Sequence, residues 1–124
     1  MSKESFRSFR DLKAWQFGME ATRSVYELTR SFPTNEQFGL ISQMRRAAAS
    51  IPANVAEGHA RDSTREFLHH LSIALGSLAE LETFLQLGVD LGYCNVQRIE
   101  GISDRCDELG RVLRGLQKAL KARL

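Results

Sequence analysis

The sequence has few of the residues that interrupt helices or cross-link small proteins. Two prolines, two cysteines and one tryptophan occur among 124 residues, and β-branched residues are sparse. Neither a CxxC spacing nor a disulfide framework is present, so we expect Cys94 and Cys106 to be reduced thiols, as in a cytosol. No run approaches about 18 apolar residues, which excludes a membrane-spanning helix. The N-terminus lacks the apolar core of a signal peptide, and we therefore expect a cytoplasmic protein.

The abundant residues are typical of helices. Leu, Ala, Glu and Arg dominate, with 43% hydrophobic and 26% charged residues overall. These are good helix formers in the proportions of a globular protein. A chain of 124 residues can bury a core without a metal or a disulfide. We expect a single domain over residues 1–124, with residues 1–8 as an N-terminal tail.

The net charge of +2 conceals an uneven distribution. Residues 80–108 contain two basic and seven acidic side chains, whereas residues 109–124 contain five basic and no acidic ones. So small a net charge does not by itself indicate a nucleic-acid partner. The local excess of positive charge near the C-terminus is more informative, because a partner meets one surface rather than the average.

Hydrophobic periodicity predicts four helices. Apolar residues recur every three or four positions from about Phe9 to Arg30, from Thr34 to Gly58, from Ser63 to about Leu91, and from Asn95 almost to Leu124. Connections this short favour antiparallel neighbours. The predicted fold is all-α: an antiparallel up-down-up-down four-helix bundle.

Local signals indicate where these helices begin and end. Ser63 and Glu66 form a capping box, and Thr34 with Gln37 fits the same pattern. Gly92 supplies a position where a left-handed backbone costs little, so we expect the third helix to close there.

The second helix contains a proline. Pro52 has no N–H to bond the carbonyl of Ala48, and its ring crowds that turn. We expect the second helix to be kinked at Pro52, or to break and restart there. Gly58 is expected to follow the end of the helix as a left-handed residue.

Several segments resemble a known family. The four-helix-bundle proteins encoded by 23S rRNA intervening sequences are similar to this chain in FRDLKAW near its start, in the pair Phe32-Pro33, in the block GLISQMRRAAASIPANVAEG and in REFLHHLSIALGSLAELE. The resemblance extends from Phe9 to about Leu120, and SIPANVAEG is its most specific part. The accessory variability determinant of diversity-generating retroelements shares this fold. The resemblance implies a homopentamer of bundles without recognised catalysis and, in the retroelement branch, a basic surface that binds nucleic acid and a reverse transcriptase.

A row of basic residues lies near the C-terminus. Steps of three and four positions place its members within one quadrant of the last helix: Arg111, Arg114, Lys118 and Lys121. Such a row can follow the phosphates of a nucleic acid. The alternative is a solvated outer face, favoured by its position near a helix C-terminus. Arg45 and Arg46 in the second helix are further candidates for a nucleic-acid surface.

A polar row accompanies the apolar face of the second helix. Its members recur at steps of seven, four and three: Gln43, Ser50, Asn54 and Glu57. We expect these side chains to form a hydrogen-bond network that fixes helix register or oligomer geometry. A polar pocket for a ligand is the alternative.

Two arginines occupy an unusual position in the last helix. Arg98 and Arg105 are seven residues apart and project toward the apolar side, where a lone charge is costly. We expect each to lie at a subunit boundary or to pair with a carboxylate from the set Glu57, Glu80 and Glu82.

No catalytic signature is present. Phosphate-binding glycine loops and HExxH are missing, and we interpret His59, His69 and His70 as solvated or hydrogen-bonded rather than as metal ligands. We therefore expect a protein that is not an enzyme, without cofactor, metal or small-molecule substrate. Two functions remain. The first is an oligomeric scaffold, a homopentamer by resemblance, that binds structured RNA or DNA through basic stripes. The alternative is a protein–protein interaction hub, such as an accessory subunit to a reverse transcriptase, without direct nucleic-acid binding.

Overall fold

The computed structural model describes residues 8–124, which are helical without any strand. The elements are a 3₁₀ turn η2 (Phe9–Asp11), α1 (Lys13–Thr29), a 3₁₀ turn η3 (Thr34–Glu36), α2 (Leu40–Ala60), α3 (Thr64–Asp90) and α4 (Val96–Lys121). Of the expected N-terminal tail, only Ser8 lies within the described residues.

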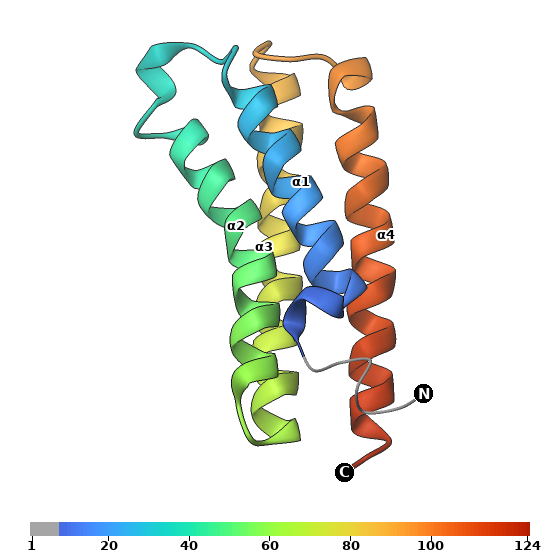
Figure 1. Cartoon of the computed structure of the whole chain (residues 1–124). Helices are drawn as coiled ribbons and strands as arrows, with labels where there is room; N and C mark the ends of the chain where they lie inside the picture. The colour runs from blue at the N-terminus through green and yellow to red at the C-terminus, as the bar shows by residue number, and fades with distance from the viewer. Residues whose placement is uncertain (1–7) are drawn as a thin grey trace.

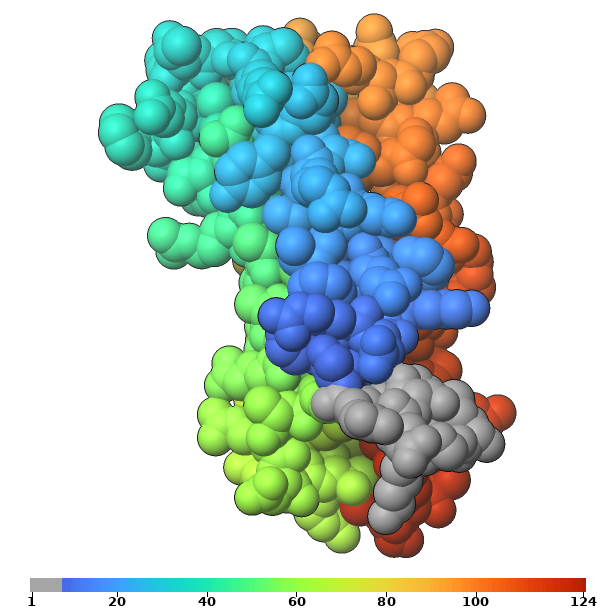
Figure 2. Space-filling model, viewed as in Figure 1, coloured from blue at the N-terminus to red at the C-terminus, as the bar shows by residue number. Residues whose placement is uncertain are grey.

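The four helices form the predicted all-α bundle. Figure 1 shows α1 and α3 running one way along the bundle and α2 and α4 running the other. Both α2 and α4 pack against α1 and α3, and the diagonal pairs make no close backbone contact within residues 8–124. In the space-filling view, α1 fills the face between α2 and α4 (Figure 2). The outer faces of α2 and α4 therefore belong to different sides of the molecule.

The core is aliphatic and drawn from every helix. The side chains that are less than 2% exposed include Val25, Met44, Ile51, Leu71, Leu81, Leu109 and Leu113. Truncating such a residue to alanine typically costs about 2–5 kcal/mol, so these contacts contribute strongly to the stability of the bundle.

The expected ends of α3 and α4 are confirmed. Ser63 Oγ accepts a hydrogen bond from the N–H of Glu66 (3.2 Å), and Asn95 Oδ1 accepts one from the N–H of Arg98 (2.8 Å). Gly92 has a φ of 78°, the left-handed conformation expected after α3. The hydrogen bonds to Ser63 and Asn95 each satisfy an N–H group that the first turn of the helix leaves unpaired.

The predicted start of the second helix at Thr34 is wrong. Thr34–Glu36 forms a 3₁₀ turn, and α2 begins only at Leu40. Glu36 takes the role expected of Thr34, because its Oε1 accepts a hydrogen bond from the N–H of Leu40 (3.3 Å). Its other oxygen accepts from the hydroxyl of Tyr93 (2.7 Å). One carboxylate thus joins the start of α2 to the α3–α4 connection.

At Pro52, α2 continues as one helix, so the expected break does not occur, while the kink stays a prediction. The carbonyl of Ala48, which Pro52 cannot bond, lies 3.1 Å from the hydroxyl of Thr22 on α1. That hydroxyl shares its hydrogen with the carbonyl of Gly18 (2.7 Å). A Cβ on Gly18 would lie 3.1 Å from Pro52 Cδ. Contact with α1 therefore compensates for the missing N–H and makes room for the ring.

The role predicted for Gly58 is also wrong. The helix continues to Ala60, and Gly58 is buried inside it. A Cβ on Gly58 would lie 2.8 Å from both Phe67 Cδ1 and His70 Cβ of α3. Close approach of α2 and α3, rather than a left-handed backbone, requires the glycine.

Candidate nucleic-acid interface and polar network

Four cations form a continuous row along the outer face of α4. We call it the α4 basic stripe: Arg111, Arg114, Lys118 and Lys121, all of them exposed. The opposite face of α4, with Leu109 and Leu113, is buried in the core. No ion pair joins a stripe residue to another residue of the described range 8–124. The stripe therefore presents positive charge that the bundle itself does not neutralise by direct pairing.

The same face is acidic further toward the start of α4. We call this the α4 acidic row: Glu100, Asp104 and Asp107, all exposed. The row ends one helical turn before the stripe begins, beside Glu82 of α3. Burial raises the pKa of Glu82, Asp107 raises it further, and Arg114 opposes the rise. A phosphate chain is thus attracted at one end of the face and repelled at the other.

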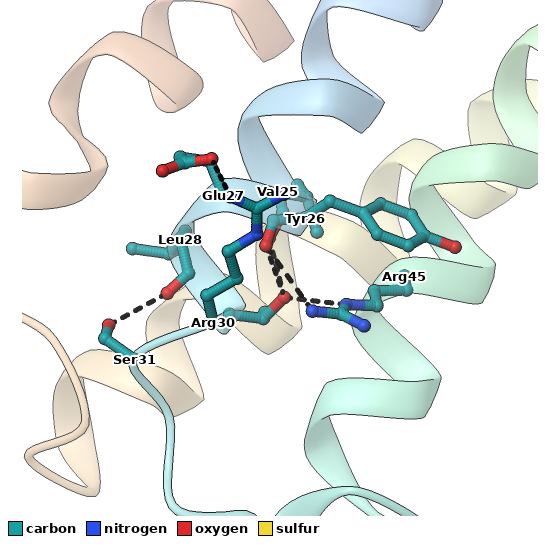
Figure 3. Close-up of polar contacts among 8 residues, drawn as sticks. Val25, Tyr26, Glu27, Leu28, Arg30, Ser31 and Arg45 are labelled. Atoms are coloured by element: carbon teal, nitrogen blue, oxygen red, sulfur yellow. Dashed lines mark hydrogen bonds and ion pairs between the residues drawn. The ribbon is translucent and has the colours of Figure 1, made fainter.

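Arg45 is engaged within the bundle rather than free on the surface. Its Nε donates to Thr29 Oγ1 (2.8 Å) and a terminal nitrogen donates to the carbonyl of Tyr26 (3.4 Å). The guanidinium carbon lies 4.5 Å from the centre of the Tyr26 ring. Figure 3 shows Arg45 of α2 reaching the end of α1 in this way. A cation is favourable at a helix C-terminus, so Arg45 stabilises the α1–α2 packing.

Arg46 is exposed but lies on another side of the bundle. It borders a surface hollow between α2 and α3 together with Gln43, Glu80 and Phe84. Because α2 and α4 lie diagonally, Arg46 is not continuous with the α4 basic stripe. The six arginines and lysines singled out from the sequence therefore do not form one surface.

Three members of the polar row lie in a chain of contacts between α2 and α3. The hydroxyls of Ser50 and Ser77 are 2.8 Å apart. The amide of Asn54 donates to the carbonyl (2.9 Å) and hydroxyl (3.0 Å) of Ser50. Its oxygen faces His70 Nδ1 at 3.0 Å, which makes that ring nitrogen the donor. The chain of bonds fixes the register of α2 against α3.

Glu57 extends this chain to the surface. Its Oε2 accepts a hydrogen bond from Arg61 (2.8 Å) and lies 3.7 Å from His70 Nε2. The hydrogen bond from Arg61 lowers the pKa of Glu57, and the charge of His70 lowers it further. Gln43 belongs to the predicted row but borders the hollow near Arg46 instead, and its side chain makes no hydrogen bond within the described chain.

Arg105 pairs with carboxylates, as expected, but the candidate partners Glu57, Glu80 and Glu82 are wrong. It pairs with Glu20 of α1 (3.0 Å) and with Glu108 of its own helix (2.7 Å). Its guanidinium carbon also lies 5.0 Å from the ring centre of Phe17. The reason is topological, since α4 packs against α1 and the edge carrying Arg105 faces that helix. Arg98 is exposed and has no ion pair in the part of the chain described.

The described residues contain no cluster of three His, Cys, Asp or Glu side chains able to hold a metal ion. Both cysteines are free. Burial, reinforced by Glu82 and Asp107, raises the pKa of Cys106 to about 12, so this thiol is a poor nucleophile at neutral pH. No helix in residues 8–124 has both the length and the apolar character needed to cross a bilayer.

Comparisons with known proteins agree with this architecture. A family model described as 23S rRNA-intervening sequence protein matches residues 10–115. A crystal structure of a protein with unknown function from the S23 ribosomal protein family, from Bacteroides thetaiotaomicron, is similar with a TM-score of 0.77 and 28% sequence identity. The match covers 85% of this chain and 98% of that one. No curated protein matches the sequence significantly.

Proposed function

Since the chain belongs to the 23S rRNA-intervening sequence protein family, we propose that it is a non-enzymatic, oligomeric scaffold that binds nucleic acid through the α4 basic stripe. One observation carries the proposal: four exposed cations share one quadrant of α4, and none is in an ion pair with another described residue. Unpaired cations gain most from phosphate, because binding releases the counterions condensed on the nucleic acid. Structured RNA and duplex DNA both offer such a backbone.

The proposed oligomer is the homopentamer that the family resemblance implies. One α4 basic stripe is a small basic surface, and five copies of it in one assembly would form an extended basic surface. Light scattering tests the assembly directly, with an expected mass of five times the 14.0 kDa of one chain. A mass equal to a single chain at micromolar concentration rejects the pentamer and leaves the test of nucleic-acid binding intact.

A salt titration tests nucleic-acid binding. Four phosphate contacts per copy give a slope of log affinity against log salt of about −3.6 on duplex DNA, so affinity should fall roughly 100-fold between about 50 and 200 mM NaCl. Fluorescence anisotropy with a labelled duplex and a labelled RNA hairpin measures it. Undetectable binding at about 50 mM NaCl, or binding that does not change with salt, overturns the proposal.

A second candidate function is a protein–protein interaction hub, for example an accessory subunit to a reverse transcriptase. It is favoured by exposed apolar side chains at the end of the bundle where the α1–α2 and α3–α4 connections lie (Figure 1). Phe38 of the first connection is 93% exposed, Leu91 at the end of α3 is 54% exposed, and Val96, the first residue of α4, is 61% exposed. Apolar surface of this kind suits a protein contact rather than phosphate. Co-purification with a reverse transcriptase that persists after nuclease treatment favours this function, and loss of the partner on nuclease treatment favours the first.

A further inference from the structure

The outer face of α4 carries its charges in a mirrored order. Each member of the α4 acidic row lies as far before Leu109 as a member of the α4 basic stripe lies after it. The matched positions are Asp107 and Arg111, two residues from the centre, Asp104 and Arg114, five residues away, and Glu100 and Lys118, nine residues away. All six side chains are exposed. Reversing the direction of the helix therefore exchanges acid for base at every one of these positions.

We propose that this face pairs with the same face of a second copy of the chain, with the two α4 helices antiparallel about a two-fold axis near Leu109. In that arrangement Asp107 of one copy faces Arg111 of the other, and the two outer pairs follow at matching heights. A two-fold contact uses the same patch on both copies, so each pair forms twice. The inner face of each α4 stays in its own bundle.

Along α4 itself the charge order is unfavourable, although Arg114 also has an acidic neighbour in Glu82 of α3. Residues three and four apart are neighbours on a helix, and like charges at those spacings repel. Asp104 has acids at both neighbouring positions of the row, and Arg114 has bases at both neighbouring positions of the stripe. Only the step from Asp107 to Arg111 joins opposite charges along the face. An antiparallel second copy places an opposite charge across from each of these repelling groups.

The second copy also explains the acids, which nucleic-acid binding does not. Glu100, Asp104 and Asp107 make no ion pair with another described residue, and a phosphate backbone following the stripe would be repelled by them. The pairing is independent of the proposed nucleic-acid binding but covers the same stripe. Phosphate and the second copy should therefore compete for it.

The proposed contact consists of exposed ion pairs and has no apolar centre. Each ion pair therefore contributes little free energy, and the contact as a whole is sensitive to salt. Nuclease-treated protein at high concentration should show twice the mass at about 25 mM NaCl that it shows at about 500 mM, by sedimentation equilibrium. Where the unit at high salt is a larger assembly, each copy offers one face, and the mass at low salt should be at least twice the mass at high salt. An equal mass under both conditions overturns the proposal.

Charge exchange tests the register. Asp104→Arg places an arginine opposite Arg114 of the other copy, and Arg114→Asp places two acids opposite each other, so each single variant should weaken pairing roughly tenfold or more. The double variant D104R/R114D restores opposite charges and should restore the mass at low salt. Both positions are exposed, and circular dichroism confirms that each variant folds.

The outcomes separate pairing from nucleic-acid binding. Asp104→Arg leaves all four stripe residues in place, so it should lose the second copy while binding duplex DNA at least as tightly as the unchanged chain. Pairing that survives Asp104→Arg, or a folded double variant that does not recover pairing, contradicts the proposed contact. If the unchanged chain does not bind DNA, the proposed function is rejected, whereas the proposed pairing is unaffected.

Discussion

Replacing Gly58 by valine should lower the free energy of unfolding by about 3 kcal/mol, although valine forms helices more readily than glycine. The first atom of any side chain at Gly58 would lie 2.8 Å from Phe67 Cδ1 and 2.8 Å from His70 Cβ. His70 Cβ is fixed by its own backbone and cannot move aside. The helices α2 and α3 would have to separate, which would also stretch the contacts among Ser50, Asn54 and His70.

Gly76 provides the matched control. It lies inside α3, and nothing is within 4 Å of a Cβ built there. Gly76→Val should change stability by less than about 0.5 kcal/mol, since only helix propensity is altered. Urea unfolding followed by circular dichroism measures both variants. Equal stability of the two would show that α2 and α3 are not as close as the structure places them.

The double variant R114E/K118E should bind duplex DNA about 100-fold more weakly at about 100 mM NaCl, because two phosphate contacts become two repulsions. Both side chains are exposed and outside any ion pair with the described residues, but Arg114 favours the carboxylate of Glu82, so the free energy of unfolding should fall by no more than about 1 kcal/mol. Anisotropy at constant salt and urea unfolding measure the two effects separately.

The control for R114E/K118E is a double variant that changes the net charge by the same amount at positions outside the α4 basic stripe. Arg23 of α1 and Arg65 of α3 are exposed and outside the stripe, and R23E/R65E changes the net charge equally. This control should lose only a few-fold in affinity, through the long-range field. If both double variants lose affinity to the same extent, net charge rather than the α4 basic stripe determines binding.

The helices could be predicted from the sequence because their signals are local. The apolar repeat, the cap at Ser63, the start of the last helix near Asn95 and the left-handed Gly92 each depend on residues within one or two turns. The roles predicted for Gly58 and Thr34 are wrong because glycine and threonine each occur in more than one structural role near helix ends. In the sequence, a glycine that ends a helix cannot be distinguished from a glycine that lets a neighbouring helix approach closely. The position of the neighbouring helix is needed to tell them apart.

The site could be predicted only in part, because its contacts cross between helices. Ser50, Asn54 and Glu57 follow from periodicity in α2. Their partners Ser77 and His70 depend on the register of α3, which no pattern within α2 contains. Likewise, the sequence alone indicates only that Arg45 is a further cation of the second helix. Its hydrogen bonds to the end of α1 become visible only in the structure. The α4 basic stripe was accessible from sequence because all its members share one helix.

In the proposed function, the charged outer face of α4, and not a pocket, binds nucleic acid. Amide chemical-shift mapping during titration with a short duplex tests it most directly. The shifts should concentrate at residues 111–121 and shrink strongly at about 200 mM NaCl. Shifts that instead concentrate around the hollow lined by Gln43, Arg46 and Glu80, with residues 111–121 unchanged, would contradict it.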